Sequence, residues 1–140
     1  MNKFFQLNRL IVLFIGIGLL VLSFEVYLMH YDQLAVKKIM WTPVIFGTIG
    51  GFCVILVSLI FNRISYYLFL VVMGISICVG FLGLYLHNRW RFPAIITTLF
   101  SHKPFDFEIL TTYTPLLAPS AFIAIGGLGI LIALFERWNK

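Results

Sequence analysis

Glu25 is an acidic residue inside a long apolar stretch, which makes it the first candidate for chemistry in this sequence. Residues 10–24 carry no charge, and residues 26–29 are apolar before polar sequence begins. A carboxylate surrounded by apolar groups is unfavourable unless it is hydrogen-bonded or paired. We therefore expect Glu25 to meet a polar group on a neighbouring segment.

Two histidines and an aspartate extend this candidate site. His30 and Asp32 follow Glu25 closely, and His87 ends another apolar stretch. Imidazole and carboxylate groups bind zinc, iron, copper or manganese, and paired imidazoles bind haem iron. One interpretation is a metal ion or haem held by Glu25, His30 and His87, with Asp32 nearby. Glu25 and His30 point roughly 140° apart in an unbroken helix, at ~100° per residue, so this site requires the helix to end or bend near Met29.

Two other interpretations of the same residues remain open. In the first, Glu25 pairs with His87, or bonds to backbone or a hydroxyl, and a cluster that also includes His30, Asp32 and Asn88 has a structural or binding role. In the second, the loss of water around Glu25 makes its charge switchable, as a small proton-coupled transporter requires. The residue types and spacing fit all three interpretations.

The composition indicates a membrane protein. Of 140 residues, 61% are hydrophobic and 11% are charged, whereas soluble domains have about 25% charged residues. The net charge of +5 suits contact with anionic lipid headgroups. The basic residues are spread along the chain rather than gathered in a stripe, so we do not expect nucleic acid as a partner.

Four apolar stretches are long enough to cross a bilayer, which needs about 20 residues. They predict spans at about residues 10–29, 43–61, 64–86 and 117–135 of a single integral membrane domain, residues 1–140. The short break at Asn62 and Arg63 makes the second and third spans an antiparallel hairpin. Pro93 precedes a mostly apolar piece, residues 94–100, that favours a short interfacial helix. The predicted fold is all-α, a four-transmembrane-helix bundle with this interfacial helix in the third loop.

Four spans place both termini on one side of the membrane. Five basic residues fall on each side, so the positive-inside rule alone does not decide the orientation. The α-amino group adds a charge on the side of the termini, and the charges of the long third loop count for less. We expect cytoplasmic termini in the cell membrane, which places the Glu/His cluster at the extracytoplasmic surface.

Small residues recur at helical spacing and predict packing surfaces between helices. Gly47 and Gly51 form a GxxxG pattern in the second span. Four residues share one stripe of the third span: Ser76, Gly80, Gly83 and His87.

The sequence contains no motif of nucleotide binding or hydrolysis: P-loop, GxSxG and HExxH patterns are absent. Cys53 and Cys78 stand singly in apolar stretches, so we expect two small buried hydrophobic side chains rather than a redox site. We therefore expect a non-enzymatic subunit or assembly factor, which packs against other membrane subunits or against a second copy of itself. A metal- or haem-binding redox protein and a small transporter are the alternatives.

Overall fold

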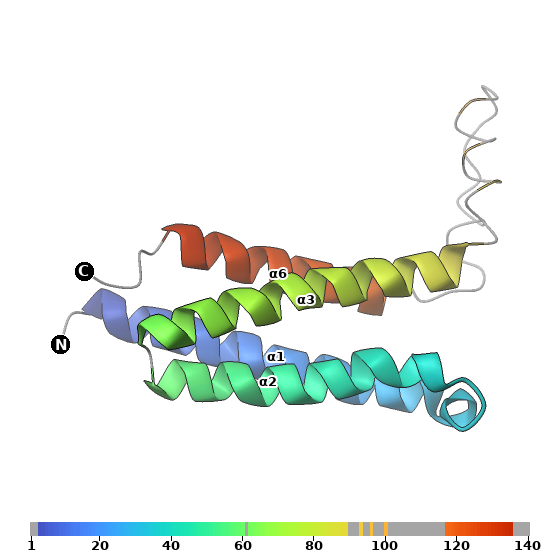
Figure 1. Ribbon diagram of the computed structural model, residues 1–140, viewed down its shortest axis with the longest axis horizontal. Coiled ribbons are helices and arrows are strands. Elements are labelled where there is room, and N and C mark those ends of the chain that lie inside the picture. The colour runs from blue at the N-terminus through green and yellow to red at the C-terminus, as the bar shows by residue number, and fades with distance from the viewer. Residues whose placement is uncertain are drawn as a thin grey trace.

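The chain folds as an all-α bundle of four membrane-length helices. The computed structural model describes residues 3–60, 62–89, 93, 96, 100 and 117–135 (Figure 1). Its helices are α1 (Lys3–Leu34), the 3-10 turn η1 (Lys38–Met40), α2 (Trp41–Ile60), α3 (Arg63–Asn88) and α6 (Leu117–Phe135). All four α-helices are long and apolar enough to span a membrane, and the described residues include no strand. The predicted fold class is confirmed, and the chain is a multi-pass membrane protein.

The four helices occupy the predicted spans, but two of them are longer than the bilayer requires. α1 extends from Lys3 to Leu34 rather than over residues 10–29, and α3 continues to Asn88. A helix can continue beyond the hydrocarbon core of the bilayer when the residues that follow also favour helical structure. The predicted interfacial helix, residues 94–100, falls largely outside the described residues.

The turn between α1 and α2 is held by Trp41. Its indole Nε1–H donates a hydrogen bond of 3.1 Å to the carbonyl oxygen of Leu34, the last residue of α1. The Trp41 ring also lies 6.3 Å from the ring of Tyr27, measured between centroids. Pro43 lies in the first turn of α2, where its missing N–H removes no helical hydrogen bond.

The bundle consists of two helix pairs, α1 with α2 and α3 with α6, each packed more extensively than the pairs are against one another (Figure 1). Glycines permit this close approach. A Cβ atom on Gly47 would lie 2.8 Å from the Cβ of Ser23, and one on Gly80 would lie 2.7 Å from the Pro119 carbonyl oxygen. The predicted packing role of these small residues is therefore confirmed within each pair.

Hydroxyl groups add polar contacts inside each pair. The Ser23 hydroxyl donates to the Val44 carbonyl oxygen at 2.7 Å and lies 2.8 Å from the Thr48 hydroxyl, joining α1 to α2. Ser76, which is fully buried, donates to the Phe122 carbonyl oxygen at 2.8 Å and joins α3 to α6. Such bonds contribute roughly 0.6 to 1.7 kcal/mol each in membrane proteins.

The two pairs meet through a thinner layer of side chains. The rings of Phe46 and Phe122 lie 6.1 Å apart between centroids, and Val72 packs beside Gly50. One expectation about side-chain burial is wrong. Cys78 is exposed on α3, whereas Cys53 is half-buried and packs against the hydrophobic core.

Candidate functional site

His30 lies on the face of α1 that packs into the bundle. This face is marked by the buried residues Val12, Leu19 and Val26, and His30 follows Val26 by one helical turn. The Nδ1 atom of His30 is 3.0 Å from the Val26 carbonyl oxygen. A carbonyl oxygen only accepts hydrogen bonds, so Nδ1 carries the hydrogen, and Nε2 of the neutral ring keeps its lone pair for another partner.

His87 is brought to the same end of the bundle by α3. The start of this helix is fixed by Asn62, whose side-chain oxygen accepts a hydrogen bond of 2.8 Å from the Ser65 N–H. Gly80 and Gly83 then pack α3 against Pro119 of α6, and His87 follows on the same stripe. The His87 ring lies 5.5 Å from the His30 ring between centroids, with an angle of 54° between the ring planes.

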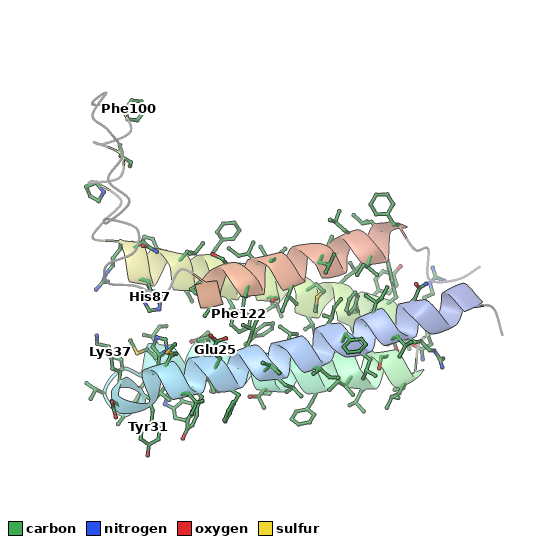
Figure 2. The ribbon with its side chains drawn as sticks, turned by 180° about the vertical axis from the view of Figure 1, so that it is seen from behind. Glu25, Tyr31, Lys37, His87, Phe100 and Phe122 are labelled. Carbon is green, nitrogen blue, oxygen red and sulfur yellow. The ribbon has the colours of Figure 1, made fainter. Side chains whose placement is uncertain are left out.

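Glu25 does not join the two histidines. Its side chain is exposed, and within the part of the chain that the structure describes no hydrogen bond or ion pair links it to His87. α1 is helical without a break from Lys3 to Leu34, so the helix does not end near Met29, as a shared site could require. Figure 2 shows Glu25 on the side of α1 that is turned toward α6. The same stripe carries Gly18, where an added Cβ would lie 3.5 Å from a side-chain carbon of Ile125 in α6.

The other two residues of the predicted cluster are also separate from the histidine pair. Asp32 is exposed near the end of α1. Asn88 is buried, but its side-chain amide donates a hydrogen bond of 2.9 Å to the Leu84 carbonyl oxygen, so its partner lies within α3 itself. Among the described residues, no group of three or more His, Cys, Asp and Glu side chains is arranged to hold one metal ion.

A cavity of about 240 Å³ lies between the two helix pairs at the histidine end, and both His30 and His87 line it. Its walls are contributed by α1, η1, α2, α3 and α6. Lys37 and Arg89 join the histidines in the lining, and Phe122 lines it from α6. Lys37 and His87 lie on facing sides of the opening between the pairs (Figure 2). The site is therefore an apolar space with four nitrogen-bearing side chains around it.

Sequence reasoning did not identify Lys37, Arg89 or Phe122 as parts of a site. Lys37 and Arg89 stand just beyond helix ends, where basic residues are common in membrane proteins. Their presence there therefore does not indicate a binding site. Phe122 is one of 15 phenylalanines in the sequence. What these three residues share is their position around the cavity, which depends on how the pairs pack.

No protein-family model, no curated protein and no solved structure matches this chain.

Proposed function

We propose that this chain is a non-enzymatic subunit or assembly factor of a membrane complex, and that Glu25 takes part in its contact with another membrane chain. The supporting observation is an exposed carboxylate within the membrane-length segment Asn8–Leu34, without a hydrogen bond or ion pair to the described residues. Acidic residues in membrane helices usually face other helices or water-filled cavities, because contact with lipid is unfavourable.

The level of Glu25 in the membrane strengthens this argument. Ser23 bonds to Val44, which lies one turn into α2, so Glu25 stands near the first turns of that helix and not beyond its end. A cationic or hydrogen-bond-donating side chain from a second chain would remove the unfavourable contact between the carboxylate and lipid. Among the helices described here, none supplies that group.

The experiment is native mass spectrometry of the complex purified from native membranes at native expression level. We expect a complex of fixed stoichiometry, with another protein or with a second copy of the chain. Glu25→Lys should dissociate it, because it reverses the charge at the contact. Asp32→Lys is the matched control, since Asp32 lies two turns further along the same face of α1, and that variant should keep the complex intact. A monomer as the only species at native expression would contradict the proposal.

A second candidate function, metal or haem binding, is favoured by the contact between His30 and His87. The hydrogen bond from Nδ1 of His30 to Val26 directs the ring and leaves Nε2 available as a ligand. Metal analysis and a visible absorption spectrum of the purified chain test this function. Metal or haem that is bound at a fixed ratio and lost in both His30→Ala and His87→Ala would support it. A preparation from native membranes with neither would remove it.

A further inference from the structure

The geometry points to a binding site for an anionic lipid, with its headgroup at Lys37, His87 and Arg89 and part of an acyl chain in the cavity between the helix pairs. This inference concerns a ligand of the cavity, and it does not depend on Glu25 or on a partner chain.

The inner part of the cavity is apolar. Six of its lining residues come from α1, α3 and α6 and present hydrocarbon or aromatic surface: Val26, Val79, Leu82, Leu86, Pro119 and Phe122. Val79 and Phe122 are buried, and Phe122 packs against Phe46 of the other pair. An acyl chain matches these walls, whereas a small hydrophilic molecule would leave them without apolar contact.

The rim of the cavity, in contrast to its apolar inner part, is polar and basic. Lys37 and Arg89 are cationic, and the His87 imidazole can donate a hydrogen bond, whereas the N–H of the neutral His30 ring is already bonded to Val26. Among the described lining residues none is acidic, and Glu25, although it adjoins Val26 in sequence, does not line the cavity. Basic pockets between transmembrane helices bind anionic lipid headgroups in this way, with roughly 1 kcal/mol from each Lys or Arg.

The depth and the volume of the cavity both suit a lipid. Trp41, which lies between the lining residues Met40 and Thr42 in the sequence, bonds to Leu34 at the α1–α2 turn, and tryptophans are enriched at the level of lipid headgroups. The cavity volume of about 240 Å³ is below the roughly 300–1,000 Å³ of sites that enclose a whole small molecule. A lipid needs only part of one chain inside, because the rest stays in the bilayer.

The test uses native mass spectrometry of the full chain, treated with EDTA and delipidated in detergent, with phosphatidylglycerol or phosphatidylcholine of identical acyl chains added. We expect phosphatidylglycerol to bind about tenfold more tightly. Lys37→Gln should weaken its binding about fivefold, which corresponds to roughly 1 kcal/mol. Lys38→Gln is the matched control, because Lys38 is the adjacent lysine and does not line the cavity; it should change binding less than twofold.

A second variant tests the cavity rather than the charge. Val79→Phe fills the space and should reduce phosphatidylglycerol binding without altering the basic residues; if this variant fails to fold, the comparison of Lys37 with Lys38 still decides. Equal binding of the two lipids, or equal losses in Lys37→Gln and Lys38→Gln, would overturn the inference. Displacement of phosphatidylglycerol by millimolar inorganic phosphate would overturn it too, because the site would then recognise only a free anion.

Discussion

The imidazole rings of His30 and His87, 5.5 Å apart between centroids, join α1 to α3 across the diagonal of the bundle. These two helices belong to different pairs, and direct contacts between them are few. The histidine contact lies at the mouth of the cavity that separates the pairs. It therefore links the packing of the two halves to the geometry of the candidate site.

A double-mutant cycle should detect this contact as a coupling energy. His30→Ala and His87→Ala should each lower the free energy of unfolding in detergent, and the double variant should lose less than the sum. We expect a coupling of about 0.5–1.5 kcal/mol, the range for contacts between aromatic rings. Reversible unfolding in mixed micelles, followed by circular dichroism, measures it.

The control cycle uses Glu25→Ala with His87→Ala. No hydrogen bond or ion pair joins these two residues, so their effects should add to within about 0.5 kcal/mol. Additive effects of the two histidine variants, together with strong coupling of Glu25 to His87, would show that the carboxylate and not His30 is the partner of His87.

The sequence was sufficient to predict the four spans, because the thickness of the bilayer fixes how long an apolar stretch must be. It was not sufficient to predict which face of each helix points inward. In a soluble protein the alternation of polar and apolar residues reveals that face. In α1 the exposed Phe14 and Val21 and the buried Leu19 and Val26 are all apolar, so the pattern carries little information about which face points inward.

This lack of pattern explains why the sequence permits pairing of Glu25 with His87 and does not single out the contact between His30 and His87. Glu25 stood out as the charge in an apolar stretch, yet its position relative to the core depends on the rotation of α1. The buried residues Leu19 and Val26 are seven apart, and His30 continues their stripe one turn later. The buried stripe of α1 can be identified only when the helices that pack against α1 are known.

Gly80→Ala should destabilise the α3–α6 pair. The added Cβ would lie 2.7 Å from the Pro119 carbonyl oxygen and 2.6 Å from a side-chain carbon of Ile123, so the helices must move apart. Overpacking of this kind lowers stability by about 1–3 kcal/mol. Gly74→Ala on the same helix is the control. Nothing lies within 4 Å of its added Cβ, and alanine favours helix over glycine by roughly 0.5–1 kcal/mol, so this variant should be neutral or more stable.

Thermal unfolding of the two glycine variants in detergent separates these outcomes. If Gly74→Ala were as destabilising as Gly80→Ala, the close approach of α3 to α6 at Pro119 would not be the cause.

Ser76→Ala should weaken the same pair through a lost hydrogen bond. The buried hydroxyl crosses from α3 to the Phe122 carbonyl oxygen, and its removal should lower the free energy of unfolding by about 0.6–1.7 kcal/mol. Ser58→Ala is the comparison, because the Ser58 hydroxyl bonds to Ile55 within its own helix at 2.6 Å and joins no second helix. The change measured for Ser58→Ala should be smaller. An equal loss in both variants would mean that bonds between helices are no more important here than bonds within one.

The sidedness of the cavity follows from the expected cytoplasmic position of the termini. Lys38 is exposed at the cavity end of the bundle, and Arg63 is exposed at the opposite end, where α3 begins. In a background with Cys53→Ala and Cys78→Ala, a membrane-impermeant maleimide added to intact cells should label Lys38→Cys and leave Arg63→Cys unlabelled. Both variants should react after detergent solubilisation, which controls for access to the thiols. The reverse pattern in intact cells would place the termini outside and the cavity at the cytoplasmic surface, since an even number of spans keeps Arg63 on the side of the termini.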